Sequence, residues 1–102
     1  MSALSVADVL ERAADLIEPE GKWTQKNGGV RGVCWCASTA IGAAHPDGIA
    51  LDAQRFFANL ISPGGGLAIV RIWCWNDAPE RTQAEVVAKL REAAALAREQ
   101  GK

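Results

Sequence analysis

The sequence predicts an α+β protein of one small domain, with about four helices packed on a short two-stranded sheet. Apolar residues recur at helical spacing in several segments, two shorter runs have the composition of strands, and glycine-rich or proline-rich stretches separate them. The chain has 102 residues, of which 49% are hydrophobic and 23% charged. This length allows one packed core and no second one, so we expect a single domain over 1–102.

The clearest helical patterns lie near the two ends of the sequence. Residues 5–18 place their apolar side chains on one face, and Ser5 with Asp8 resembles a capping box. In the C-terminal part, Thr82 and Glu85 form a second capping box ahead of another apolar stripe. We therefore expect one helix at each end.

The segments between these helices are assigned from composition. Residues 19–29 are rich in glycine and lysine and indicate a loop, and the β-branched residues in 30–35 favour a short strand. Small residues over 37–44 predict a closely packed helix, and 50–61 is a further helical candidate.

A second strand is expected at 67–75, after the break at 62–66. Its alternate positions divide into a small apolar set that should face the core and a bulkier set that should be partly covered. The first set is Ala68, Val70, Ile72 and Cys74, and the second is Ile69, Arg71, Trp73 and Trp75. The long connection between the two strands permits either parallel or antiparallel pairing.

The net charge and the number of cysteines indicate which binding partners and which cellular compartment to expect. The net charge is −1, and basic residues such as Lys22, Lys26 and Arg31 are too sparse for phosphate binding, so no nucleic-acid partner is expected. No apolar run is long enough to cross a bilayer, and the first residues lack the basic start of a secretory signal. With an odd number of cysteines, three, reduced thiols in the cytoplasm are the expectation.

Metal binding is one chemical hypothesis. Cys34, Cys36, Cys74 and His45 are four potential zinc ligands. Zinc knuckles place two cysteines on a turn, two to four residues apart, whereas Cys34 and Cys36 belong to an expected strand and its end. Free cysteines are commonly buried, so we expect core thiols, no metal and no cofactor.

Thiol catalysis is a second hypothesis. A helix that begins at Cys36 would lower the pKa of its thiol, and Gln25 upstream could serve as an oxyanion donor, an arrangement papain-like in outline. The base would have to be His45, which an intervening helix carries roughly 13 Å away. No catalytic residue is therefore assigned, and we expect a protein that is not an enzyme.

Aromatic and amide side chains supply the binding candidates. Trp73 and Trp75 can fill a core or anchor a partner, and Asn76 and Asp77 can form a turn or a ligand loop before the last helix. The full set of candidate binding residues is Trp23, Gln25, Trp73, Trp75, Asn76 and Asp77.

Several short motifs resemble a family of small uncharacterised proteins from actinobacteria and their phages, a WND-type domain of unknown function. They are Trp23-Thr24-Gln25, Cys36-Ala37-x-x-Ala40-Ile41, Trp75-Asn76-Asp77 and Thr82-x-x-Glu85-Val86. The resemblance implies a single α+β domain in a bacterial or phage cytoplasm and supplies no catalytic residues.

The sequence thus favours a binding or interaction module that is not an enzyme, with a protein partner or a second copy of itself. A small thiol-dependent hydrolase or transferase that uses Cys36 is the alternative, and a structural zinc protein is the third hypothesis.

Overall fold

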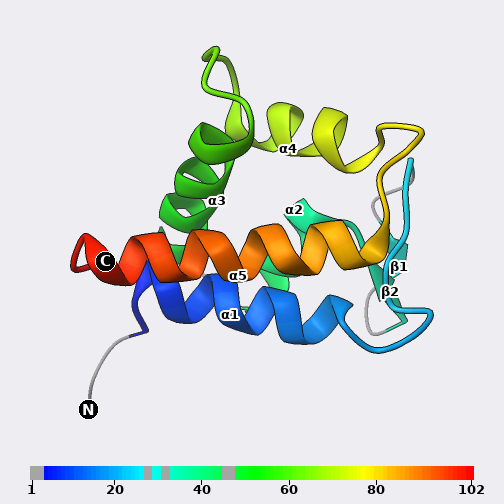
Figure 1. Cartoon of the computed structure of the whole chain (residues 1–102), viewed down its shortest axis with the longest axis horizontal. Coiled ribbons are helices and arrows are strands. Elements are labelled where there is room, and N and C mark those ends of the chain that lie inside the picture. Colours follow the sequence, from blue (N-terminus) through cyan, green and yellow to red (C-terminus); the bar gives the residue numbers. More distant parts are fainter. Residues whose placement is uncertain (1–3, 27–28, 31–32, 45–47) are drawn as a thin grey trace.

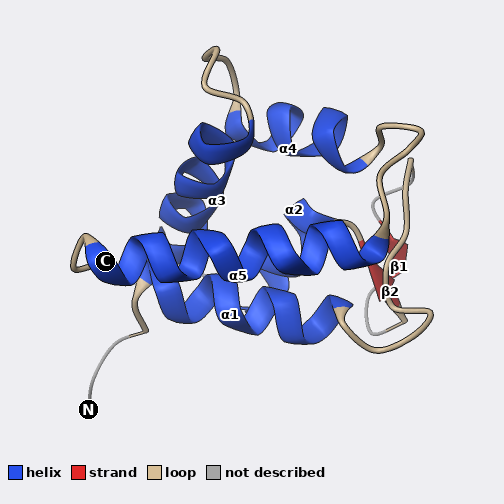
Figure 2. Ribbon diagram, in the orientation of Figure 1, coloured by secondary structure: helices blue, strands red, loops and turns tan. Residues whose placement is uncertain are grey.

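A computed structural model describes the chain except for residues 1–3, 27–28, 31–32 and 45–47. Across the described ranges it forms five helices and a two-stranded antiparallel sheet, which confirms the α+β class. The sheet lies at one end of the molecule and the helices make up the rest (Figure 2). The elements are α1 Val6–Ile17, β1 Gly29–Val30, β2 Cys34–Trp35, α2 Ala37–Ala44, α3 Gly48–Ile61, α4 Ala68–Asn76 and α5 Gln83–Glu99.

Helices α1 and α5 lie side by side and antiparallel, with α4 on the opposite side of the molecule (Figure 1). Both predicted capping boxes are present. The Ser5 hydroxyl accepts from the Asp8 N–H at 3.1 Å, and the Asp8 carboxylate accepts from the Ser5 N–H at 3.1 Å. Thr82 and Glu85 form the same reciprocal pair at 3.2 and 2.9 Å. These bonds satisfy amide groups that have no partner within a helix.

Small side chains allow α1 and α5 to approach closely, while a few large ones fill the rest of the core. The larger side chains come from all five helices of the described chain, so one core joins them. The buried alanines are Ala7, Ala13 and Ala14 of α1 with Ala93, Ala94 and Ala97 of α5; the large buried residues include Leu10, Ile17, Ile41, Phe57, Ile72 and Leu90.

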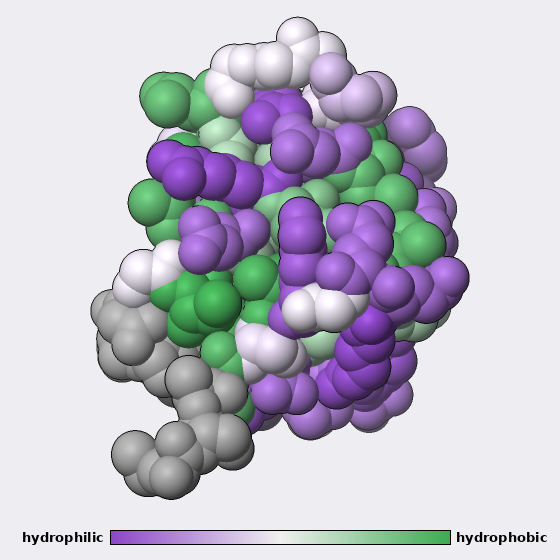
Figure 3. Space-filling model, turned by 90° about the vertical axis from the view of Figure 1, so that its left-hand side faces the viewer, coloured by the Kyte–Doolittle hydropathy of each residue, from purple (hydrophilic) through white to green (hydrophobic). Residues whose placement is uncertain are grey.

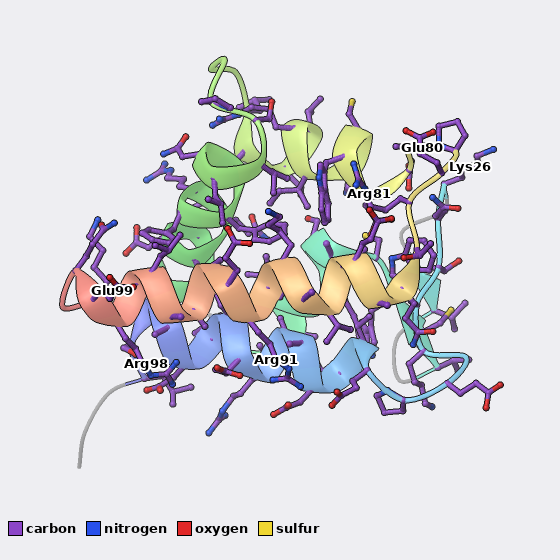
Figure 4. All side chains as sticks on the ribbon, in the orientation of Figure 1. Lys26, Glu80, Arg81, Arg91, Arg98 and Glu99 are labelled. Atoms are coloured by element: carbon purple, nitrogen blue, oxygen red, sulfur yellow. The ribbon has the colours of Figure 1, made fainter. Side chains whose placement is uncertain are left out.

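Ion pairs join the outer edges of α1 and α5. Arg91 and Arg98 extend from α5 toward α1 (Figure 4). Hydrogen bonding to the carboxylate of Asp15 is the main cause that raises the pKa of Arg91. The pairs are Arg91 with Glu11, Asp15 and Glu18 at 2.7, 3.1 and 2.9 Å, and Arg98 with Asp8 and Glu11 at 3.3 and 3.5 Å.

The prediction of a strand at 67–75 is wrong, because this segment forms helix α4. Ala68, Ile72 and Trp75 follow the spacing of one helical face and pack toward the core. Cys74, expected to point inward with Ile72, is exposed, and Val70 is also exposed. A short apolar run fits both periods, and here packing against α2 and α3 favours the helix.

The single strand expected at 30–35 is instead a tight hairpin. β1 pairs with β2, with Gly29 opposite Trp35 and Val30 opposite Cys34, and β1 begins at Gly29, the last residue of the expected loop. Gly29 has φ +90°, and a Cβ at this position would collide with the Cys34 carbonyl oxygen. Only glycine fits here, because it lacks a Cβ and tolerates positive φ.

We predict that Gly29→Ala destabilises the protein by about 2–4 kcal/mol, since it combines backbone strain with a steric clash. Gly21→Ala is the matched control, because Gly21 also has a positive φ, +80°, but open space around it. Its cost should be about 1 kcal/mol. Urea unfolding of both variants measures the difference; equal losses would contradict the clash.

Acid should weaken the start of α1. The hydrogen bond from the Ser5 backbone N–H, with the Arg98 charge as a smaller cause, lowers the pKa of Asp8 below its ordinary value of 3.8. A lowered pKa stabilises the fold above the ordinary value, and this contribution disappears as the pH falls through the folded value.

We therefore expect Asp8→Asn to flatten the dependence of stability on pH below about pH 4. The difference should be a few tenths of a kcal/mol, because Asp8 is partly exposed and its charge is screened by water. Urea unfolding at several pH values measures it, with the exposed Asp52→Asn as control. An unchanged slope in Asp8→Asn would refute the assignment.

Candidate functional site

The side chain of Asn76 joins three segments that are distant in the sequence. Its Oδ1 accepts from the Trp23 indole N–H at 2.8 Å and from the Ala37 N–H at 3.0 Å. Its Nδ2 donates to the Thr24 carbonyl at 3.0 Å and to Asp77 Oδ1 at 3.0 Å. Asn76 is completely buried, and its amide makes all four of the hydrogen bonds available to it.

The loop that precedes β1 caps the C-terminus of α4. Gln25 Nε2 donates to the carbonyl oxygens of Asn76 and Ala78 at 2.9 and 2.8 Å, and the Lys26 N–H donates to Asp77 Oδ1 at 2.8 Å. Carbonyls at the end of a helix need such partners. Lys26 has φ +72°, a conformation uncommon for residues other than glycine, which these contacts hold in place.

The same loop also pairs with the hairpin. The Thr24 N–H donates to the Trp35 carbonyl at 3.0 Å, and the Trp35 N–H donates to the Lys22 carbonyl at 2.7 Å. Trp23 therefore forms a parallel bridge with Trp35. Backbone bonds to the hairpin and side-chain bonds to α4 together fix the position of this loop. We call the residues Trp23, Thr24, Gln25, Lys26, Ala37, Asn76 and Asp77 the Asn76 network.

Trp75 is held between α3 and the loop that follows α4. Its ring meets Phe57 edge to face, with 5.5 Å between ring centroids. On the other side, the Arg81 guanidinium lies 4.2 Å from the ring centroid and donates to the Trp75 carbonyl at 2.9 Å. In Figure 4, Arg81 extends toward α4 from the segment before α5. These contacts give Trp75 a cation–π partner and an aromatic partner within the chain.

Most of the candidate binding residues are therefore brought together. Trp23, Gln25, Asn76 and Asp77 belong to the Asn76 network, and Trp75 lies beside it. Their role in binding stays a prediction, because each has contacts inside the chain. The remaining candidate, Trp73, lies outside the network and is 44% exposed.

The sequence reasoning missed Val70 as a surface residue and Arg81 as the partner of Trp75. The signal for Val70 was present, since helical spacing places it on the same side of α4 as Ile69 and Trp73. Nothing local in the sequence indicates the position of Arg81, because the contact depends on the turn between α4 and α5.

The thiol hypothesis finds no supporting geometry in the described part of the chain. Cys36 precedes α2 as expected, but it is 2% exposed, and its thiol lies 3.4 Å from the Thr39 hydroxyl. Gln25 already donates to two carbonyls, so its amide N–H groups are occupied. His45, the base that this hypothesis needs, lies outside the described residues.

The zinc hypothesis is similarly unsupported. Cys34 is half-buried in β2, Cys36 is buried, and Cys74 is exposed on α4. Among the residues that the structure describes, no three His, Cys, Asp or Glu side chains gather closely enough to hold a metal ion. His45 was the fourth potential ligand and again falls outside them.

The fold and the Asn76 network define a small α+β protein in which one buried amide joins the loop at Trp23 and Thr24, the start of α2 and the end of α4. The chain belongs to DUF6197, a family of unknown function that matches residues 1–96. The predicted resemblance to a small domain of unknown function is thus confirmed. No curated protein and no solved structure matches the chain. Within the described residues, none of the helices is both long and apolar enough to cross a membrane.

We predict that Asn76→Ala lowers the free energy of unfolding by about 3 kcal/mol or more, since it leaves buried donors and acceptors unpaired. Asn76→Asp should be comparably damaging, because it puts an acceptor opposite the Thr24 carbonyl. Trp23→Phe removes one hydrogen bond and should cost about 1 kcal/mol.

Chemical denaturation measures these losses. Gln100→Ala is the control, because the Gln100 side chain is also an amide but is exposed, so its loss should cost only about 0.5 kcal/mol. If Asn76→Ala is no more destabilising than Gln100→Ala, the network does not hold these segments together.

Proposed function

We propose that this protein is an interaction module that binds a protein partner through the outward face of α4. The observation that carries the proposal is the composition of this face. Ile69, Val70, Trp73 and Cys74 point away from the core and are all exposed, at 38%, 43% and 44% for the first three. Leu67, immediately before the helix, is 73% exposed.

This composition differs from that of an ordinary surface helix. A helix packed on one side normally presents charged or polar side chains to water on the other. The charged residue within α4, Arg71, bonds to Asn59 and to the Ser62 carbonyl. Contiguous apolar surface of this kind is typical of interaction sites.

Trp73 is the proposed anchor. Tryptophan is enriched among the few residues that supply most of the binding free energy of an interface. Trp73 differs from Trp75, because the ring of Trp75 is already packed against Phe57 and Arg81. Substitution of Trp75 therefore tests stability, whereas substitution of Trp73 tests binding.

The binding face is held rigidly at both ends of α4. Asn76 is fixed by its four hydrogen bonds at the C-terminal end. Near the N-terminal end, Arg71 NH1 bonds to Asn59 and to the Ser62 carbonyl at 3.0 and 2.7 Å. A face that is ordered before binding loses less conformational entropy when the partner binds. The proposal also includes the cytoplasmic location that the sequence predicts.

We expect Trp73→Glu to abolish partner binding with little change in thermal stability, because the side chain is exposed and a charge is unfavourable in an apolar interface. Native mass spectrometry of the protein isolated gently from its own host measures this, since it reports bound chains directly. Wild type should retain a partner chain that Trp73→Glu lacks.

Val33→Glu is the matched control, because Val33 is 56% exposed but lies at the hairpin rather than on α4. It should keep the partner. A bound second copy of the chain, lost in Trp73→Glu, would make the partner the protein itself. If wild type and Trp73→Glu carry the same bound chains, the proposed face is not the binding site.

A further inference from the structure

A groove between α3 and α4 adjoins the proposed binding face. Its volume is about 500 Å³, and its apolar lining includes Leu51 of α3 with Leu67 and Ile69 at the start of α4. Two arginines, Arg55 of α3 and Arg71 of α4, also line it. The face of the molecule that contains α3 shows hydrophilic side chains directly beside apolar areas (Figure 3).

The charge of this groove is one-sided. Its lining includes no aspartate or glutamate from the described chain, and neither arginine forms an ion pair with a described residue. By contrast, Arg81, Arg91 and Arg98 each pair with a carboxylate. The excess positive charge therefore lies next to exposed leucine and isoleucine.

The two arginines differ in how they are held. Arg71 NH1 is oriented by Asn59 and by the Ser62 carbonyl, while its Nε is buried without a hydrogen-bond partner among the described residues. Arg55 is exposed. Arg71 thus supplies a fixed charge and Arg55 an adaptable one, an arrangement suited to carboxylates spaced along a partner.

We propose that this groove binds an acidic amphipathic helix of a protein partner. Apolar side chains of that helix contact Leu51, Leu67 and Ile69, and its carboxylates pair with Arg55 and Arg71. The inference rests on the proposed function, because it names the chemistry of the partner that uses the α4 side of the molecule.

A second depression adjoins the groove and extends it toward α2. Its volume is about 390 Å³, and it shares Gln54 and Ile69 with the first. Gly42 and Ala43 of α2 form part of its lining. Such small side chains let a partner backbone approach closely, so an extended helical segment fits the surface better than a compact ligand does.

Charge and shape argue against the other classes of ligand. Attraction to an anionic bilayer generally needs clusters of about four to eight basic residues, and the groove supplies two. A small molecule is usually enclosed over most of its surface, whereas this groove is only partly enclosed. A helical peptide can bind with only two charged contacts and can lie in an open groove, so it agrees with both observations.

The test uses a labelled synthetic helix of about 15 residues with leucines along one face and glutamates beside them, since that length supports helix formation. A matched peptide carries lysine in place of every glutamate. Fluorescence anisotropy with the intact protein measures both affinities. We expect the glutamate peptide to bind about tenfold or more tightly than the lysine peptide, with a preference that weakens at high salt.

Arg55→Glu should lower affinity for the glutamate peptide about tenfold and raise affinity for the lysine peptide. Arg12→Glu is the matched control, because Arg12 is exposed on α1 and does not line the groove; it should leave the preference unchanged. Circular dichroism melting verifies that both variants fold. Equal binding of the two peptides, or no effect of Arg55→Glu, overturns the inference.

Further outcomes distinguish failure of this inference from failure of the proposed function. If Trp73→Glu removes the host partner but Arg55→Glu does not, the interaction module stands and the acidic helix is wrong. If neither substitution affects host partner binding, both proposals fail. Binding to vesicles of phosphatidylserine and phosphatidylcholine that depends on Arg55, without a preference for the glutamate peptide, would assign the groove to a membrane surface and overturn the inference.

Discussion

The buried side-chain amide of Asn76 is the interaction on which the arrangement of the other elements depends. It holds the end of α4 against the start of α2 and against the loop at Trp23 and Thr24. An unpaired polar group in this position would be costly, so the segments must all be in place together. Asparagine suits the site because it presents two acceptor positions and two donors at once. The orientation of α4, and hence of its apolar outer face, follows from this contact.

Different kinds of interaction stabilise the two sides of the molecule. Between α1 and α5, alanine packing is supplemented by exposed ion pairs such as Arg91 with Glu11, which salt screens. Around Asn76, the hydrogen bonds are buried or partly buried apart from the exposed bond of the Lys26 N–H, and only those to Asp77 involve a charged group. Salt should therefore affect the first side more than the second. The groove arginines are close to the second side and have no acidic partners in the described chain.

Local signals predicted part of this fold and tertiary packing determined the rest. Capping boxes at Ser5 and Thr82 predicted α1 and α5 correctly, because a cap depends on residues close in the sequence. The segment at 67–75 was assigned to a strand because its apolar residues fit either period. The site candidates Trp23, Gln25, Asn76 and Asp77 were identified from motifs, yet their mutual hydrogen bonds span more than fifty residues and have no local signature.

The pairing of α1 with α5 has a consequence for how the protein is made. The ribosome must synthesise everything between Ile17 and Gln83 before α1 meets the helix that covers much of its apolar face. Until then, α1 is an amphipathic segment with its leucine and valine side chains available to other chains. Contacts between residues so far apart also slow the search for the native state. Productive folding should thus follow release of the α5 segment from the exit tunnel.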